Sequence, residues 1–397
     1  MKQQIKYGST GRHGLTACVL LAILAAGCAA PPLREKTEAP APTPEPEYAN
    51  IRIALMQYEN TVQIAMEEGT IYSDTQKMSF QSPQTLTADR SFLNCAGESV
   101  ELPVTIYSSR PLRIGEKSYY GHLLIQDGYV INIIPVDVYT VGVLHGEVPA
   151  SWPMEVLKAQ AVVSRTYAYS RILHQSDELF HAGSTEMYQK YEYGEGSAAI
   201  EQAVMSTSNE ILLYQDQPIE VFFHACSGGR TENSRDVFQK DLPYLRSIPD
   251  PYCARDERFA WTFTADSVLI GQALIDMGAV KGQSVSAREI RIRSRTGSGR
   301  VREFLVSLEG GEEVLVQGNQ LRLALDPKSF KSLLITEIDR ERTGGETRFV
   351  FHGRGYGHGV GMSQWGAKAM ADQGFSYRHI LAHYYPGTRI GMVWDIR

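Results

Sequence analysis

The sequence predicts an α+β protein: a mixed, β-rich main domain with one long functional helix, and a smaller α/β subdomain inserted into it so that a cleft forms. Three observations predict this fold class. Short β-type runs dominate residues 51–136, a helix follows near residue 151, and the pattern changes to helix, hairpin and helix between residues 262 and 339. The chain has 397 residues, of which 43% are hydrophobic and 21% charged, which is enough for two modest domains.

The first 27 residues are predicted to be an export signal. Three cations, Lys2, Lys6 and Arg12, precede an apolar run over residues 15–26 that is too short to span a bilayer comfortably. The small residues of "AAGC" lead into Cys28 and resemble the bacterial lipobox, in which the cysteine receives lipid. A plain signal peptide with a chance cysteine is the alternative. The lipobox implies an exported protein, lipid-anchored through Cys28 at the cell envelope (periplasm or outer membrane face).

Residues 28–49 are predicted to be a tether between this anchor and the folded body. The segment is rich in Pro, Ala and Glu, so it cannot build a core and suits a semi-rigid, extended spacer. The chain has a formal net charge of −6 and contains no basic run or aromatic-interleaved patch. Its composition therefore argues against nucleic acid as a partner.

The main domain is expected to cover residues 50–261 and 340–397. Runs such as "IRIALMQY" and "VELPVTIY" are rich in β-branched and aromatic residues and are broken by Gly, Asp and Pro, which indicates a mostly antiparallel β region over 51–136. Glu147 is then placed in a turn bounded by Gly146 and Pro149, just ahead of the long helix.

The helix is predicted to begin near Ser151–Pro153, because Pro is tolerated in the first helical turn. Its buried stripe follows helical spacing and a second face carries two cations. The stripe consists of Val156, Ala159, Val163 and Tyr167, and the cations are Lys158 and Arg165.

The later segments alternate between strands and helices. Residues 211–223 indicate two strands around "QDQP", followed by a Gly/Ser-rich loop, "HACSGGRTENS". Residues 262–339 indicate the inserted subdomain, with a helix in "ADSVLIGQALIDMG", a hairpin in "EIRIRSRTGSGRVREFLVSL" and a short helix in "VQGNQLRLAL". The last segment opens as a strand, passes a glycine-dense loop and continues into two helices.

Three cysteines remain once the signal and anchor cysteines are set aside. Cys95, Cys226 and Cys253 would lie in an oxidising compartment, where one disulfide and one free thiol is the simplest arrangement. Cys226 and Cys253 are the preferred pair because both lie in one loop-rich segment. A metal site that includes His224 is the alternative, but a clear fourth ligand is missing.

The glycine-dense loop, "GRGYGHGVGMSQWG", spans residues 353–366. Alternating glycines remove side-chain bulk, so that backbone amides can approach a ligand closely. The residues between them are hydrogen-bonding or stacking types that suit a sugar: Arg354, Tyr356, His358, Gln364 and Trp365. No phosphate-loop pattern is present, and the alternative is a tight structural loop.

Three motifs in order carry a resemblance to a known family. "DVYTVGVLHGEVPASWPMEVLKAQAVVSRTYA", "FFHACSGGRTENSRDVF" with "LPYLRSIPDPYC", and "GRGYGHGVGMSQWGAKAMADQGFSYRHILAHYYPGT" resemble the stage II sporulation protein D and amidase-enhancer (SpoIID/LytB) family over residues 51–388. The resemblance implies a peptidoglycan lytic transglycosylase that cleaves MurNAc–GlcNAc bonds of peptide-stripped glycan strands, with 1,6-anhydro products. The family's catalytic Glu falls on Glu147, and its Arg, expected to line the glycan cleft, falls on Arg165.

Other cleft candidates accompany these two. Weaker candidates are Tyr167, Tyr188 and Gln189, and the substrate-binding set also includes His224, Ser227, Tyr356, His358 and Gln364. Some relatives hold zinc through a Cys/His cluster, but the matching stretch here, "FHAGSTEMYQKY", offers no thiolates. We therefore predict no metal and no cofactor.

A lytic transglycosylase explains why one carboxylate is enough. Hydrolysis of a glycoside uses two carboxylates, whereas here Glu147 protonates the bridging oxygen and then deprotonates the muramic 6-hydroxyl, which closes an anhydro ring without water. Glu147 needs a raised pKa for this role, and Val148, Pro149 and Trp152 are expected to supply the apolar wall.

Two alternative functions stay open at this point. A non-catalytic, wall-binding lipoprotein would recruit or enhance an N-acetylmuramoyl-L-alanine amidase, with Glu147 merely capping the turn. His224 and Ser227 also permit a Ser/His hydrolase, although no GxSxG elbow or acid partner is evident.

Overall fold

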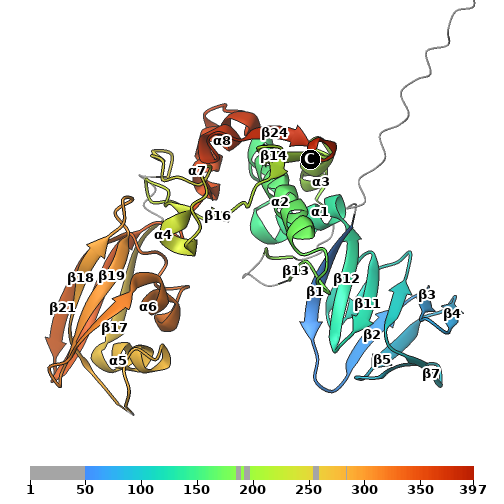
Figure 1. Cartoon of the computed structure of the whole chain (residues 1–397), viewed down its shortest axis with the longest axis horizontal. Helices are drawn as coiled ribbons and strands as arrows, with labels where there is room; N and C mark the ends of the chain where they lie inside the picture. The colour runs from blue at the N-terminus through green and yellow to red at the C-terminus, as the bar shows by residue number, and fades with distance from the viewer. Residues whose placement is uncertain (1–49, 185–188, 192–196, 254–258, 283) are drawn as a thin grey trace, which may run out of the picture. The chain divides into compact units, whose positions relative to one another are not determined.

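The computed structural model describes residues 50–184, 189–191, 197–253, 259–282 and 284–397. The fold is mixed α+β and rich in strands, as the sequence predicts, and these residues contain eight α-helices (Figure 1). The expected signal, the anchor Cys28, the tether and the cleft candidate Tyr188 lie outside the described residues. None of the helices in the described ranges combines the length and hydropathy needed to cross a bilayer.

Residues 50–135 form the strands of two sheets. The strands are β1 (Asn50–Gln57), β2 (Val62–Met66), β3 (Gly69–Tyr72), β4 (Lys77–Phe80), β5 (Gln84–Ala88), β6 (Phe92–Cys95), β7 (Glu98–Glu101), β8 (Val104–Tyr107), β9 (Leu112–Ile114), β10 (Lys117–Tyr119), β11 (His122–Gln126) and β12 (Tyr129–Pro135), joined by β13 (Ala182–Gly183). Their orders are β13-β1-β12-β11-β8-β3-β4 and β10-β9-β2-β5-β6-β7.

The two sheets enclose one hydrophobic core. Alternate residues of each strand face inward, and Ile64, Leu86, Ile106 and Leu123 are fully buried there. All neighbouring strands are antiparallel except β1 and β13, which pair in parallel. The predicted antiparallel β region is therefore confirmed.

Three helices follow the sheets and position the candidate site. They are α1 (Val136–Glu147), α2 (Met154–His174) and α3 (Ala198–Met205), and α2 lies against both others (Figure 1). Helix α2 begins directly after Pro153, as expected. Helix α1 was not predicted: Glu147 is its last residue, so it ends a helix and does not stand in an isolated turn. The β-branched residues and glycines of α1 hide its helical pattern.

Helix α2 is buried on more faces than one stripe. Val156, Ala159 and Val163 are fully buried as predicted, while Tyr167 is half-buried. Arg165, placed by its spacing on a different face, is buried as well. Asp137, Val204 and Glu210 cover that face, which helical periodicity alone does not reveal.

The end of the chain returns to residues 210–238. The elements here are β14 (Glu210–Tyr214), β15 (Gln217–Pro218), β16 (Phe223–His224), α4 (Ser234–Phe238), β23 (Met362–Ser363), α7 (Gln364–Asp372), α8 (Tyr377–Tyr384), β24 (Arg389–Met392) and a 3-10 helix (Val393–Asp395). Strand β14 pairs with β15 and β24, and β16 pairs in parallel with β23. These pairings bring the "HAC" segment against the glycine-dense loop.

Residues 260–354 have a hydrophobic core of their own. They form β17 (Ala260–Asp266), α5 (Ser267–Asp276), β18 (Ala287–Arg295), β19 (Val301–Leu308), β20 (Glu313–Gln317), α6 (Gly318–Leu325), β21 (Ile335–Thr343) and β22 (Glu346–Arg354). The strands make two three-stranded sheets, β17-β22-β21 and β18-β19-β20, around Phe304, Phe330 and Phe351. The helix, hairpin and short helix expected from the sequence are present as α5, β18–β19 and α6.

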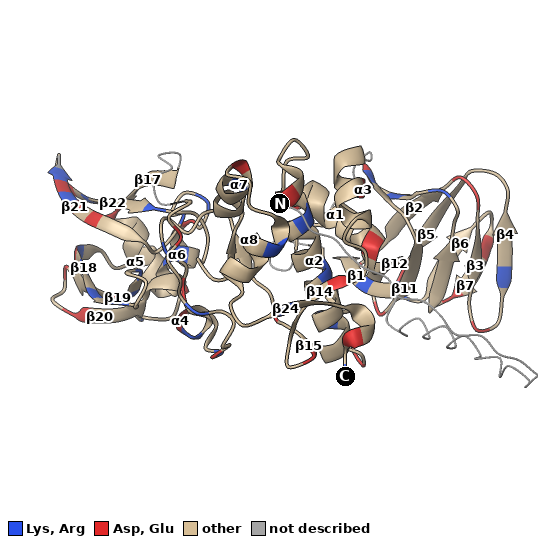
Figure 2. Ribbon diagram, turned by 90° about the horizontal axis from the view of Figure 1, so that it is seen from above, with Lys and Arg blue, Asp and Glu red and all other residues tan. Residues whose placement is uncertain are grey.

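Strand β21 lies at the edge of its sheet and carries charges of both signs. Figure 2 shows the acidic and basic bands along it, which come from the segment "EIDRER". Alternating charges on an edge strand discourage pairing with another chain.

Candidate active site

A cavity of about 720 Å³ lies where α1 and α2 meet the β16 segment and the glycine-dense loop. It brings together seven of the residues predicted from the sequence: Glu147, Tyr167, Gln189, His224, Tyr356, His358 and Gln364. Residues that the sequence reasoning missed complete the lining: Gly146, Ser170, Arg171, Lys190, Glu220, Val221, Phe222, Phe223, Ala225, Phe238 and Gly357. Arg165 and Ser227 do not line it.

Glu147 is held at the carboxyl end of α1 from two sides. Its Oε1 accepts a hydrogen bond from the backbone N–H of Lys190 at 2.8 Å, and its backbone carbonyl accepts one from Gln364 Nε2 at 3.4 Å. Gly146 permits this approach, since a Cβ there would lie 2.6 Å from the carbonyl oxygen of Lys190. The half-buried carboxyl group is thus oriented by backbone on one wall of the cavity.

The apolar part of the cavity differs from the one expected. Val148 is buried in a separate core cluster and Pro149 is exposed. Trp152 packs edge-on against Trp365, with ring centroids 5.0 Å apart. None of these three residues lines the cavity, where the apolar surface comes instead from Val221, Phe222, Phe223 and Phe238. The residues next to Glu147 in the sequence do not form the wall, because it is supplied by residues about 75 to 90 positions further along the chain.

Gln189 presents an unsatisfied amide to the cavity. The hydroxyl of Tyr139 donates to its Oε1 at 3.0 Å, and burial holds the pKa of Tyr139 well above its usual value, so this phenol stays protonated. The Gln189 Nε2 is buried and has no hydrogen-bond partner among the described residues. A buried amide donor without a partner favours a ligand oxygen at this position.

Val360 fixes the protonation of two histidines in the same wall. Its carbonyl accepts a hydrogen bond from His224 Nδ1 at 3.1 Å, and its N–H donates to His358 Nδ1 at 3.0 Å. His224 therefore carries its proton on Nδ1 and offers a lone pair at Nε2, whereas His358 carries its proton on Nε2. The His224 Nε2 has no partner in the part of the chain that the structure describes.

Both imidazoles are neutral at physiological pH. Burial, assisted by Arg300 and Arg322, lowers the pKa of His358 to about 4. Burial, assisted by His358 and Arg300, lowers the pKa of His224 well below its usual value. Gly357 permits this packing: its φ of +104° suits glycine, and a Cβ there would lie 2.8 Å from the His224 Cβ.

Arg165 is buried behind the cavity and does not line it, contrary to the expectation that it lines the cleft. Its side chain is 1% exposed, and its Nε donates to Asp137 Oδ1 of α1 at 2.6 Å. Its two other nitrogens donate to the backbone carbonyls of Glu210 and Val204. Arg165 therefore ties α1, the end of α3 and β14 together behind the cavity.

Arg171 is the arginine of α2 that reaches the cavity. It lies four residues after Tyr167, so both side chains share one face of the helix, and its Nε donates to the His181 carbonyl at 2.8 Å. The spacing of Tyr167, Ser170 and Arg171 was the signal that could have identified this face. Glu220, the second carboxylate of the cavity wall, is paired with Lys240 at 2.6 Å.

The "HAC" segment is fastened by a disulfide next to the cavity. Cys226 and Cys253 form the disulfide that the sequence favoured, with Cα atoms 6.1 Å apart, and Cys95 is a buried free thiol. Cys226 is thus not available as a thiolate ligand. No group of three or more His, Cys, Asp and Glu side chains within the described residues is arranged to hold a metal ion.

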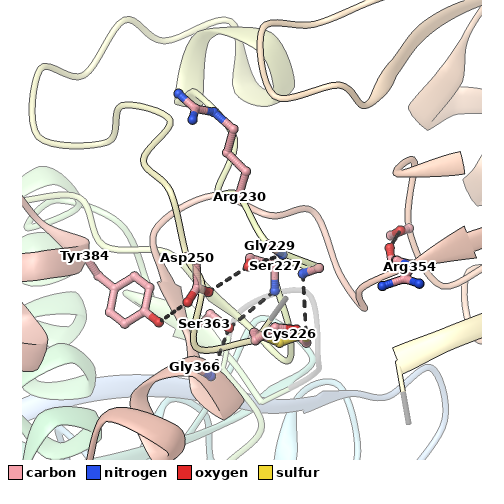
Figure 3. Close-up of a disulfide and its surroundings, with 12 residues drawn as sticks. Cys226, Ser227, Gly229, Arg230, Asp250, Arg354, Ser363, Gly366 and Tyr384 are labelled. Carbon is pink, nitrogen blue, oxygen red and sulfur yellow. Dashed lines mark hydrogen bonds between the residues drawn. A yellow bond between two sulfur atoms is a disulfide. The ribbon is translucent and has the colours of Figure 1, made fainter. Parts of the chain in front are cut away.

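Ser227 is buried and serves the loop structure (Figure 3). Its Oγ donates to Asp250 Oδ2 at 2.7 Å and accepts from the backbone N–H of Gly229. Tyr384 donates to the other oxygen of Asp250 at 3.1 Å. The Ser227 hydroxyl is engaged with a buried carboxylate and lies outside the cavity lining. Ser227 therefore has neither of the two roles that the sequence left open, a cleft residue or a hydrolase nucleophile.

Comparisons with known proteins agree with the resemblance. The family described as "Stage II sporulation protein" (SpoIID) matches residues 126–214, and one described as "Domain of unknown function (DUF8618)" matches residues 252–361. The chain is 30% identical to the Stage II sporulation protein D of Bacillus subtilis over 316 residues, 74% of this chain and 87% of that protein.

Two further relatives extend this result. An uncharacterized protein of Brachyspira hyodysenteriae is 33% identical over 278 residues, 68% of this chain and 72% of that protein. The Amidase enhancer of Bacillus subtilis is 29% identical over 293 residues, which cover 63% of this chain and 40% of that protein. The chain therefore belongs to the SpoIID family.

Proposed function

We propose that this protein is a peptidoglycan lytic transglycosylase that cleaves MurNAc–GlcNAc bonds of peptide-stripped glycan strands, with Glu147 as the general acid and base. The observation that carries the proposal is the backbone-oriented carboxyl group of Glu147 in a cavity lined by aromatic, amide and imidazole side chains. Such a lining suits a hydroxyl-rich ligand such as a sugar chain. Membership of the SpoIID family supports a cell-wall role.

The reaction needs one carboxyl group. Protonated Glu147 gives its proton to the bridging oxygen as the bond from that oxygen to the muramic C1 breaks. The muramic 6-hydroxyl then attacks C1, and the Glu147 carboxylate takes the hydroxyl proton. Water is not consumed, and the product ends in a 1,6-anhydro ring. The internal nucleophile reacts at a high effective concentration, because it belongs to the same sugar.

The cavity residues hold the strand and do not exchange protons in this scheme. The buried Gln189 Nε2 is a donor and the buried His224 Nε2 an acceptor, which together suit an acetamide or a pair of hydroxyls. Tyr356 and the stacked pair Phe222 and Phe238, with ring centroids 4.2 Å apart, offer surfaces for sugar faces.

A paired variant experiment tests the proposal. Amidase-treated peptidoglycan is incubated with the mature protein, its Glu147→Gln variant and its Glu220→Gln variant, and the released fragments are analysed by mass spectrometry. Loss of a general acid lowers the rate by roughly 100-fold or more, so the Glu147 variant is expected to release almost no anhydro fragments. Glu220 is neutralised by Lys240, and its variant is expected to stay within about tenfold of the wild type. Equal release by the wild type and the Glu147 variant would exclude catalysis by Glu147.

A second candidate function is a non-catalytic role in recruiting or stimulating a cell-wall amidase. The relative named Amidase enhancer favours it. In that case the Glu147→Gln variant would stimulate a purified amidase as well as the wild type does, and neither protein would release anhydro fragments on its own.

A further inference from the structure

A second cavity, of about 430 Å³, adjoins the candidate active site. Gly357 and His358 line both cavities, so the two cavities are neighbours along the glycine-dense loop. The second cavity is cationic, since its lining contains four arginines and two carboxylates. The arginines are Arg235, Arg300, Arg302 and Arg322, and the carboxylates are Glu232 and Asp236. We call it the arginine cavity.

Two of these arginines are almost completely buried. Arg300 is 2% exposed and donates to the backbone carbonyls of Arg230 and Ser227. Arg322 of α6 is 8% exposed and donates to the carbonyls of Phe330, Pro327 and Lys331. Both guanidinium groups are therefore held rigidly by backbone oxygens, which do not neutralise their charge.

Neither buried arginine has a carboxylate within 4 Å among the described residues. The Glu232 carboxylate accepts from the backbone N–H of Asn233 and from the hydroxyls of Thr296 and Ser298. Ser298 links it to Arg300, whose Nη1 donates to the Ser298 Oγ at 3.0 Å. Asp236 is paired with the exposed Arg302. Burial lowers the pKa of Arg300 to about 10, so it is still charged at neutral pH. Its buried Nε also has no partner in the described part of the chain.

We infer that the arginine cavity binds a carboxylate carried by the glycan strand that occupies the first cavity. The inference rests on the proposed function for the identity of the strand. Two buried guanidinium charges here face a single buried carboxylate, Glu232, which acts on Arg300, and a ligand carboxylate would supply further negative charge through charge-assisted hydrogen bonds. Amide side chains beside them, Gln317, Asn319 and Gln320, would hold the neighbouring polar groups of the ligand.

Peptidoglycan offers such a carboxylate from two sources. Hydrolysis of the bond between muramic acid and its stem peptide leaves a free lactyl carboxylate on the sugar itself. An attached stem peptide carries carboxylates of its own, further from the sugar. The binding experiment therefore compares ligands that differ only in these groups.

The experiment is a calorimetric titration of the mature Glu147→Gln protein, which binds strands without turning them over. The ligands are peptide-free muramyl oligosaccharides, the same oligosaccharides with amidated lactyl carboxylates, and oligosaccharides of equal length that carry stem peptides. A charged hydrogen-bonded pair contributes enough for roughly tenfold tighter binding of a carboxylate-bearing ligand than of the amidated one. This advantage is expected to shrink as salt is raised. The ligand that shows the advantage identifies the source, and equal affinities for all three would overturn the inference.

Variants locate the effect in the arginine cavity. Arg302→Gln changes an exposed member of the lining, and Arg322→Lys keeps the buried charge but removes the planar guanidinium group. Both are expected to reduce the carboxylate advantage at least about threefold. Arg348→Gln is the matched control, because Arg348 is also exposed and paired with a carboxylate but lies outside the cavity. An unchanged advantage in both cavity variants would contradict the inference, and the ligand comparison decides it if Arg322→Lys does not fold.

This result is separable from the fate of the proposed function. Carboxylate-dependent binding without release of anhydro fragments by the wild type would leave the inference standing and reject the transglycosylase. Release of anhydro fragments by the wild type, with no preference for the carboxylate in the binding experiment, would support the transglycosylase and reject the inference.

Discussion

His224 and His358 share one backbone residue, Val360, and both are kept neutral by burial. Each histidine titrates near pH 6.5 in an unfolded chain, and His358 does so at about 4 in the fold. Between these values the unfolded state binds more protons than the folded state. Stability is therefore undiminished above pH 6.5 and falls as the pH is lowered toward 4.

The expected slope is about 1.4 kcal/mol per pH unit for each such histidine. Urea unfolding at several pH values between 7 and 4.5 measures it. The His358→Gln variant is expected to show a shallower slope than the wild type, whereas the exposed control His379→Gln is expected to leave it unchanged. Identical slopes in all three proteins would show that His358 does not carry the effect.

Arg165 is expected to contribute to stability and not to sugar binding. Arg165 is buried but its partner Asp137 is 40% exposed, so the main loss in an Arg165 variant is the donor to the backbone carbonyls of Glu210 and Val204, at about 1–3 kcal/mol each. We expect Arg165→Gln to lower the free energy of unfolding by this order, with the affinity of the folded fraction for glycan unchanged. Arg171→Gln is the contrasting variant, with weaker binding and a nearly unchanged melting temperature. If the Arg165 variant were as stable as the wild type but bound glycan weakly, Arg165 would have a role in glycan binding.

Individual residues also show what sequence reasoning can and cannot predict. Glu147, Gln189, His224, Tyr356, His358 and Gln364 were predicted from motifs and do line one cavity. Arg165 was misplaced because helical spacing gives the angle of a side chain but not what later segments cover it. Glu220 and the phenylalanine wall were missed because only tertiary folding brings them to Glu147.

At the scale of elements, the cavity wall depends on how β16 is fastened. Strand β16 carries Phe223 and His224, pairs with the two-residue strand β23 and is followed within two residues by the disulfide of Cys226 and Cys253. So short a pairing offers little stability of its own. The disulfide and the buried Asp250 network in Figure 3 therefore hold this wall in place.

Loss of the disulfide is expected to destabilise the protein by about 3 kcal/mol, given the 27-residue separation of its cysteines. Thermal unfolding of Cys226→Ala/Cys253→Ala and of the control Cys95→Ala, each with and without reductant, measures the effect. Reductant should lower the melting temperature of the control and leave that of the double variant unchanged. In the unreduced, denatured mature protein, Cys95 should be the one of these three cysteines that a thiol reagent labels; labelling of all three would reject the disulfide.

Elements whose pattern is local were predicted, and those that depend on partners were not. Helices α2, α5 and α6 and the hairpin β18–β19 follow from periodicity and from Pro or Gly signals. Helix α1 was not predicted, because its composition favours strands. Strands β17 and β22 pair although about 80 residues separate them, so their place in the core of residues 260–354 could not be derived from local sequence.

At the scale of the whole molecule, the proposed function requires that the folded body, if it is anchored to a membrane, can still reach the peptidoglycan. We propose that Cys28 carries lipid and that the Pro-rich tether of residues 28–49 spaces the folded body from the membrane. In fractionated cells the wild type is expected with the membranes and Cys28→Ser in the soluble exported fraction. Recovery of the wild type in that soluble fraction would contradict a lipid anchor.

The central claim is that one carboxyl group and an internal hydroxyl cleave the strand without water. The most direct test is to digest peptide-free strands with the mature protein in water enriched in heavy oxygen and to measure, by mass spectrometry, the masses of the fragments that carry a newly formed muramic terminus. We predict fragments that are lighter than hydrolysis products by one water and that carry no heavy oxygen, and their absence when Glu147 is replaced by Gln. Fragments that incorporate heavy oxygen would show a hydrolase and contradict the account.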